Sequence, residues 1–195
     1  MVRHDIGFAP NPFYGYCTLA TCKPKVRKAA KLDDWIAGVG SKQKNQDGKL
    51  VYAMQVEEAM CFDDYWNDFR FAQKRPFRPG SVKQRYGDNI YHHKSGGSGW
   101  IQEDGRHSLE DGSPNWSHVK KDTNPPRVLI SRKFVYFGNQ AIDLPEQFLT
   151  EENRRLFVGM RDFHRNFPSE VQDAFIEWVD ELCEDGGIRG KPLDW

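Results

Sequence analysis

The chain lacks an excess of charge of either sign. Its 195 residues include 28 Lys and Arg and 28 Asp and Glu, so the formal net charge is zero. Proteins that cover long stretches of nucleic acid carry a broad basic surface, because they neutralise many phosphates. This composition excludes such a surface and restricts nucleic-acid contact to a local patch or a pocket.

Long hydrophobic runs are absent, and cysteines are few. No run approaches the roughly eighteen apolar residues that a membrane helix needs, and the first residues lack the apolar core of a secretory signal. The four cysteines, Cys17, Cys22, Cys61 and Cys183, are scattered along a chain that is too long to depend on disulfides. The sequence therefore predicts reduced thiols, a cytoplasmic location and no membrane partner.

Familiar catalytic and cofactor signatures are also missing. The chain has no GxSxG, HExxH, dinucleotide-binding or kinase motif. The stretch GVGSK, residues 38–42, lacks the spacing of a Walker loop, and a strand rather than a helix is expected after it. His92 and His93 are adjacent, so on a strand they point to opposite faces and cannot easily share one metal ion. We therefore predict neither a metal nor an organic cofactor.

What the chain does contain is the pattern of a single α+β domain over residues 1–195. Residues 1–145 are expected to form a small, mostly antiparallel sheet with short helices inserted, and residues 146–195 a helical extension. Two helices are expected in this extension. The first is marked by Leu156, Phe157, Met160 and Phe163, and the second by a capping box of Ser169 and Gln172 and by an end at Gly186.

The other elements are predicted from local composition. Residues 127–138 are dominated by Val, Ile, Tyr and Phe, which predicts one strand. Asp47-Gly48 favours a tight turn before an alternating strand. Residues 74–126 are rich in Gly, Pro, Asn, Asp and Ser, which predicts a long irregular segment with short strands near 89–92 and 99–102. So long a loop in a compact domain is often functional.

The stretch YGDNIYHH concentrates side chains that can bind or react. Its asparagine and aspartate match the donors and acceptors of a base edge, and its two tyrosines can stack on a base. Either histidine can act as a general base that the aspartate orients. The structural alternatives stay open, because Asp and Asn favour turns and a half-exposed histidine is common. The candidate residues are Tyr86, Asp88, Asn89, Tyr91, His92 and His93.

A second group of candidates lies near the N-terminal end. Arg3 and Asp5 either form a pair aimed into a pocket or lie at a solvated strand end, since buried unpaired charges are costly. Prolines on both sides of Asn11 make a rigid loop that can wall a site. Cys17 as a nucleophile would need a base and a lowered pKa, and the sequence shows neither. The ligand-binding candidates in this part of the chain are Arg3, Asp5, Asn11, Phe13, Thr21, Lys23, Ser41 and Lys42.

Five basic residues follow closely at Lys74, Arg75, Arg78, Lys83 and Arg85, with aromatic residues between them. They are either a solvated loop or a local groove for a nucleic-acid backbone. Both alternatives remain open.

The chain resembles a bacterial and phage family through six stretches: DIGFAPNPFYGYCTLATCKPKVR, DWIAGVGSK, YWNDFRF, YGDNIYHH, DGSPN and RVLISRKFVYFG. They recur in this order in the nucleotide-modification-associated domain, second of that name. The resemblance runs from Arg3 to about Gly138. Members of the family carry further apolar residues before the Arg-His-Asp, so the first strand is expected to be short here. The resemblance implies a protein that handles a nucleotide or a modified base.

The order of the elements also resembles the PUA-like superfamily, which includes the EVE, ASCH and YTH domains. That resemblance implies a curved or barrel-like sheet and a partner that is a nucleic acid or a modified base. We expect the proline-bounded loop and the YGDNIYHH segment to border one pocket.

Three functions follow from these resemblances. The first is a binding module for a nucleotide or modified base, free or within DNA. The second is an enzyme of nucleotide or base modification that uses the predicted histidine–aspartate pair. The third is a sponge for a signalling nucleotide, which would use the same pocket without chemistry. The sequence does not indicate the oligomeric state.

Overall fold

The computed structural model describes residues 1–158 and 163–195. It confirms an α+β fold, with three small and mostly antiparallel sheets. The chain separates into two compact units. The first contains Met1–Asp5, Asp33–Gln55 and Arg132–Trp195, and the second contains Ile6–Leu32 and Val56–Ser131. The single domain over residues 1–195 stays a prediction.

The first unit is built on a five-stranded sheet. The strand order is β10 (Gly187–Ile188), β8 (Phe134–Tyr136), β3 (Lys49–Gln55) and β2 (Trp35–Val39), and β9 (Ile142–Asp143) also pairs with β3. Only β10 and β8 run parallel. The five inner residues of β3 are all buried, so both faces of this strand are covered, whereas an alternating pattern suggests one covered face.

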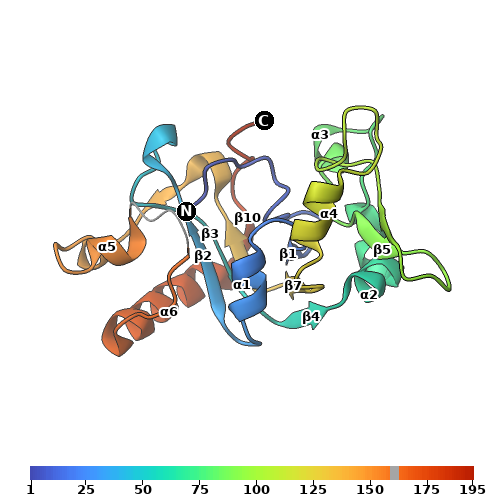
Figure 1. Ribbon diagram of the computed structural model, residues 1–195. Helices are drawn as coiled ribbons and strands as arrows, with labels where there is room; N and C mark the ends of the chain where they lie inside the picture. The colour runs from blue at the N-terminus through green and yellow to red at the C-terminus, as the bar shows by residue number, and fades with distance from the viewer. Residues whose placement is uncertain (159–162) are drawn as a thin grey trace. The chain divides into compact units, whose positions relative to one another are not determined.

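Helix α6 (Ser169–Glu184) is the long helix of this unit, and Figure 1 shows it alongside the sheet. Its Val179 packs in the same core as Leu50 of β3 and Val135 of β8. A single turn, α5 (Arg154–Phe157), precedes it. The remaining helical pieces are the 3-10 turns η1 (Lys42–Lys44), η3 (Gly138–Gln140) and η4 (Glu146–Phe148).

The prediction of two C-terminal helices needs correction. The predicted first helix is reduced to α5, Phe163 is not helical, and Met160 lies outside the described residues. The predicted capping box of α6 is not formed, because the helix already begins at Ser169 and Pro168 is its N-cap. The main-chain N–H of Gln172 donates to the carbonyl of Pro168 at 2.9 Å, which starts the helix one residue earlier than the side-chain pattern predicts.

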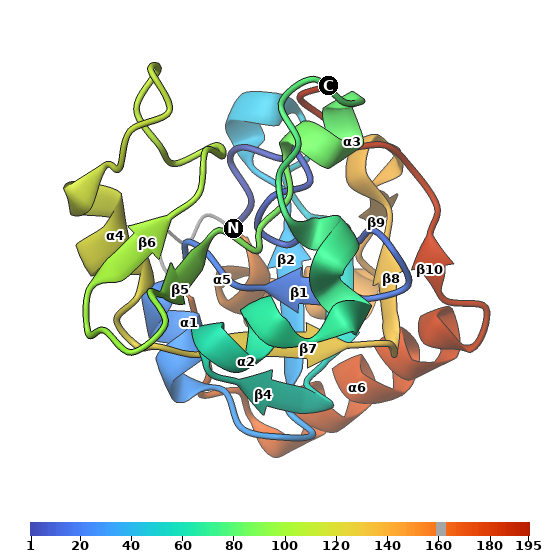
Figure 2. The ribbon, with the colours of Figure 1, turned by 90° about the vertical axis from the view of Figure 1, so that its right-hand side faces the viewer.

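The second unit contains a three-stranded antiparallel sheet and a separate hairpin. The sheet order is β1 (Cys17–Leu19), β7 (Val128–Ser131) and β4 (Glu58–Met60), which lie side by side in Figure 2. The hairpin is β5 (Tyr91–His93) with β6 (Trp100–Gln102). These strands confirm the two short strands predicted within the irregular segment.

Short helices fill out the second unit. They are α1 (Pro24–Ala29), α2 (Phe62–Asn67), the 3-10 helix η2 (Phe69–Lys74), α3 (Val82–Arg85) and α4 (Trp116–Asp122). The core of the unit is aromatic, and Phe62, Tyr65, Phe71 and Tyr91 pack in it against Ile130 of β7. Among the described residues, no helix is long and apolar enough to cross a membrane.

Two further predictions about the sheets are wrong. Residues 127–138 do not form one strand: the polar pair Arg132 and Lys133 separates β7, which pairs with β1 and β4, from β8, which pairs with β3 and β10. The barrel-like sheet is not found either. In the sheets of the described residues, β1 and β4 are open edges of one sheet and β10 and β2 of another, so neither sheet closes on itself.

Candidate functional site

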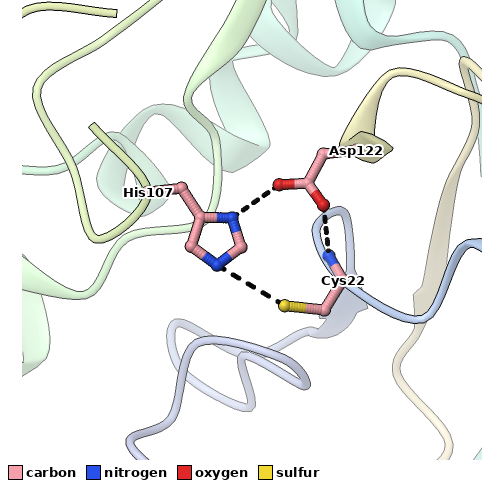
Figure 3. Close-up of side chains that lie close together, drawn as sticks. All are labelled: Cys22, His107 and Asp122. Atoms are coloured by element: carbon pink, nitrogen blue, oxygen red, sulfur yellow. Dashed lines mark hydrogen bonds and ion pairs between the residues drawn. The ribbon is translucent and has the colours of Figure 1, made fainter. Parts of the chain in front are cut away.

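A cysteine, a histidine and an aspartate meet in the second unit. Cys22 lies in the turn between β1 and α1, His107 in the segment after β6, and Asp122 at the end of α4 (Figure 3). The imidazole stands between the other two side chains. His107 Nε2 is 3.6 Å from Cys22 Sγ, and His107 Nδ1 is 2.5 Å from Asp122 Oδ2. We refer to these three residues as the triad.

The backbone of Cys22 is held on both sides. Its φ of 54° is in the left-handed region, which costs a residue with a Cβ on the order of 1 kcal/mol and needs support from its surroundings. The support comes from two hydrogen bonds. The N–H of Cys22 donates to Asp122 Oδ1 at 2.9 Å, and its carbonyl accepts from Arg27 Nε at 3.0 Å. The half-buried thiol is therefore fixed beside the imidazole.

Asp122 is fully buried and organises the triad. Its carboxylate accepts hydrogen bonds from His107, from the main chain of Cys22 and from the hydroxyl of Tyr91, the last at 2.9 Å. Burial alone would raise the pKa of Asp122, but the hydrogen bond and charge of His107 together with the other two donors lower it. Burial and the neighbouring Asp122 raise the pKa of Tyr91, which keeps its hydroxyl a donor. The carboxylate is thus ionised.

His107 is mostly buried, and near neutral pH its ring is a positively charged imidazolium. Burial opposes its charge, but the hydrogen bonds to Asp122 and Cys22 outweigh burial and raise the pKa of His107 to about 9. The ring packs edge-on against Phe8, with 4.8 Å between the ring centroids, which limits its rotation. A thiolate formed at Cys22 therefore has an imidazolium 3.6 Å away as its counter-ion.

The proton on His107 is expected to make stability depend on pH. Its pKa is about 9 in the folded protein and 6.5 without these contacts, so the stabilisation is complete below about pH 6.5 and is lost as the pH rises through 9. The loss amounts to at most about 3 kcal/mol. Urea unfolding between pH 6 and 10 should show a decline for the wild type that His107→Gln lacks. Equal pH slopes in the two proteins would contradict the raised pKa.

The same three side chains offer ligand atoms of the kinds that bind zinc, but their geometry favours proton transfer. Two ligands of one tetrahedral zinc ion are about 3.3 Å apart, given bonds of about 2 Å. The 2.5 Å between His107 Nδ1 and Asp122 Oδ2 is instead a hydrogen-bond distance. The thiol and the carboxylate also approach opposite nitrogens of the ring, of which one ion can take only one. Nucleophile, base and orienting acid are the roles that fit this order.

The structure gives each predicted histidine a carboxylate partner that the sequence analysis did not name. His92 Nε2 is 2.8 Å from Glu103, and His93 Nδ1 is 2.8 Å from Asp63. Asp88, the predicted orienting residue, is fully buried elsewhere in the unit. Its oxygens accept from the hydroxyls of Thr18 at 2.7 Å and Tyr65 at 2.8 Å.

The proline-bounded loop and the YGDNIYHH segment do meet. Asn11 Nδ2 donates to the carbonyl of Tyr86 at 3.1 Å, and Lys74 Nζ donates to Asn11 Oδ1 at 2.7 Å. Asn11, Asp88 and Asn89 are fully buried there and bonded to protein groups. Their contact is thus a packed polar interior rather than the wall of an open site.

The remaining candidates are spread over both units. In the first unit, Asp5 is buried and accepts from the hydroxyl of Tyr136, and Arg3 and Lys42 are exposed. Of the other candidates, Ser41 and Thr21 are buried, and their hydroxyls have no hydrogen-bond partner among the described residues. Lys23 is the exposed N-cap of α1, and Phe13 is buried. Thr21 stands out among them because it directly precedes Cys22.

A pocket of about 340 Å³ lies beside His92 in the second unit. It is lined by Trp66, Arg75, Pro76, Phe77, Arg78, Glu103 and Asp104. His92 stacks on Trp66, with 4.0 Å between the ring centroids, and bonds to Glu103. Two members of the basic run, Arg75 and Arg78, thus line a pocket next to the YGDNIYHH segment.

Sequence reasoning missed all three residues of the triad: it considered Cys17 rather than Cys22 as a nucleophile, and it did not name His107 or Asp122. They are 85 and 100 residues from Cys22, and no motif or periodicity links positions so far apart. The signal that did exist is Tyr91, a predicted site residue, whose hydroxyl contacts Asp122.

The chain was also compared with known proteins. The family described as "Nucleotide modification associated domain 2" matches residues 1–195. Neither the curated proteins nor the solved structures gave a match.

Proposed function

The chain belongs to the nucleotide modification associated domain 2 family, and from this premise we propose that it is an enzyme that acts on a nucleotide or a modified nucleobase through the thiol of Cys22. The observation that carries the proposal is the order of the triad: thiol, imidazole and buried carboxylate within hydrogen-bonding reach. The family supplies the context of nucleotide modification, and the triad supplies the chemistry.

The role of each residue follows from its contacts. Before substrate binds, the Cys22 thiol gives its proton to Nε2 of His107, which yields the thiolate and the imidazolium described above. The thiolate sulfur then bonds to an electrophilic carbon of the substrate. Asp122 holds Nδ1 of His107 protonated, which leaves Nε2 facing the sulfur. Tyr91 and the main chain of Cys22 fix the carboxylate in turn.

Alkylation by iodoacetamide tests the proposed nucleophile. At pH 7 we expect Cys22 to react at least about tenfold faster than Cys61, although Cys61 is the more exposed. Burial of its sulfur and the neighbouring Asp64 raise the pKa of Cys61, which keeps it a thiol and makes it a matched internal control. Peptide mass spectrometry measures both rates in one sample.

The variant His107→Gln should slow alkylation of Cys22 and leave that of Cys61 unchanged. Prior treatment with a chelator should alter neither rate, since the proposal needs no metal. Cys22 reacting no faster than Cys61, or only after chelation, would contradict the proposal.

A binding module without chemistry is the second candidate, and the pocket beside His92 favours it. The exposed ring of Phe77 offers a stacking face, and Arg75 with Glu103 offers donors and an acceptor for a base edge. A melting shift with a mononucleotide that is recovered intact, abolished by Glu103→Gln and kept in Cys22→Ser, would support this candidate.

A further inference from the structure

A second imidazole lies against the first. His118 is one turn before Asp122 on α4, so both side chains are on one face of that helix. The rings of His118 and His107 are 4.1 Å apart between centroids and inclined by 37°. A triad of the ordinary kind needs one imidazole, so the second has no role in the function proposed above.

Two polar groups beside the triad lack partners. Nδ1 of His118 and the hydroxyl of Thr21 are buried and form no hydrogen bond with any residue that the structure describes. An unpaired buried polar group costs on the order of 1–3 kcal/mol, and such groups in folded proteins call for an explanation. Thr21 adjoins the nucleophile and His118 adjoins the base. Both groups would find a hydrogen-bond partner if a bound substrate lay between them.

His118 is suited to be neutral while His107 is charged. Burial and the charge of His107 lower the pKa of His118, Lys121 and Arg106 act in the same direction, and Asp122 opposes them. Near neutral pH the two rings therefore carry one positive charge between them: His107 is the charged acid, and His118 is neutral and can accept a proton.

We propose that the substrate of the triad is an acyl compound, an amide or ester carried on a nucleotide or base, and that His118 activates the water that releases the acyl group from Cys22. This inference rests on the proposed function. Two proton sites are what such a reaction uses, because the leaving group takes a proton in one step and water loses one in the next. The Thr21 hydroxyl is available to donate to the carbonyl oxygen as it gains charge.

The steps balance with the two rings and solvent water. The Cys22 thiolate bonds to the carbonyl carbon, the bond from that carbon to nitrogen or oxygen breaks, and His107 gives its proton to the leaving atom. His118 then takes a proton from water, the water oxygen bonds to the same carbon, and the carbon–sulfur bond breaks to restore the thiolate. His118 then releases its proton to solvent, and His107 takes one from solvent at Nε2, which restores both rings and completes the cycle.

The ester p-nitrophenyl acetate tests whether His118 acts only in the step that uses water. Its leaving group needs no proton, so acylation of Cys22 does not depend on a second proton donor. Wild type should release a burst of about one p-nitrophenolate per protein and then turn over slowly. His118→Gln should keep the burst and lower the steady rate about 100-fold. Imidazole added to His118→Ala should restore part of the steady rate. Lys120→Gln, on the same helix, is the control and should match wild type.

The possible outcomes distinguish a failure of the role inferred for His118 from a failure of the function proposed for Cys22. No burst in wild type, or an equal burst in Cys22→Ser, would overturn the proposed function and this inference together. A normal burst with an unchanged steady rate in His118→Gln would overturn the inference alone. Loss of the burst in both His118 variants, with melting curves like that of Lys120→Gln, would also overturn it.

Discussion

Asp122→Asn is expected to slow acylation of Cys22 by p-nitrophenyl acetate by about 10³- to 10⁴-fold, the loss typical when the acid of a triad becomes an amide. The reason is the proton on His107. The carboxylate only accepts, so it keeps the proton on Nδ1 and leaves Nε2 free to take the thiol proton. An amide can donate to Nδ1 instead, which moves the proton to Nε2 and blocks the transfer.

The control for this prediction is Asp111→Asn, which changes an exposed carboxylate of the same unit that accepts hydrogen bonds from Ser113 in its own turn. Stopped-flow absorbance gives the acylation rate of both variants, and thermal melting shows whether Asp122→Asn is folded. A folded Asp122→Asn protein that acylates at the rate of Asp111→Asn would show that Asp122 only holds the backbone of Cys22.

The elements that the sequence predicts well are those set by local composition. The hairpin strands β5 and β6 and the start of β3 follow from alternation and turn residues, which act over a few positions. The break between β7 and β8 falls at the polar pair Arg132 and Lys133, but that pair alone did not predict it. It arises because β7 finds its partners in β1 and β4, and β8 in β3 and β10, which are distant in sequence. The strand boundaries in this segment therefore depend on the pairing partners and not on local composition alone.

In the candidate site, too, some roles followed from local sequence and others depended on distant partners. Tyr91 was predicted from a cluster of polar and aromatic neighbours, and its hydroxyl does contact the triad. Lys74 looked like part of a solvated or phosphate-facing basic run. It is fully buried, with its ammonium on Asn11 and the carbonyl of Tyr16, and burial lowers its pKa to about 8. A sequence shows that a charge is present, but its partners come from distant segments.

Arg27→Met is expected to destabilise the protein by about 3–5 kcal/mol, the largest effect on stability that we predict. Arg27 is fully buried, and its guanidinium donates to four carbonyls. The acceptors are Cys22 at 3.0 Å, Pro125 at 2.9 Å, Arg127 at 2.7 Å and Asp122 at 2.5 Å. Methionine fills much of the volume but removes all four of these hydrogen bonds, and the carbonyl of Pro125 keeps the main-chain N–H of Arg127 as a donor.

Arg27 also joins the two backbone segments that carry the nucleophile and the orienting acid, since it bonds to the carbonyls of both Cys22 and Asp122. Loss of the Arg27 guanidinium should therefore reduce the rate at which iodoacetamide alkylates Cys22 in the protein that remains folded. For a chain of this length the melting temperature should fall by about 10 °C or more. Arg27→Lys keeps the charge but has at most three donors, so an intermediate value is expected.

Lys28→Met is the matched control, because Lys28 is the exposed next residue of the same helix. Urea unfolding of the three variants and the wild type gives the free energies. If Arg27→Met unfolds within about 1 kcal/mol of Lys28→Met, water must replace the guanidinium at the four carbonyls. The segments bearing Cys22 and Asp122 would then be held together by the triad itself, and Asp122→Asn, not Arg27→Met, would be the variant that separates them.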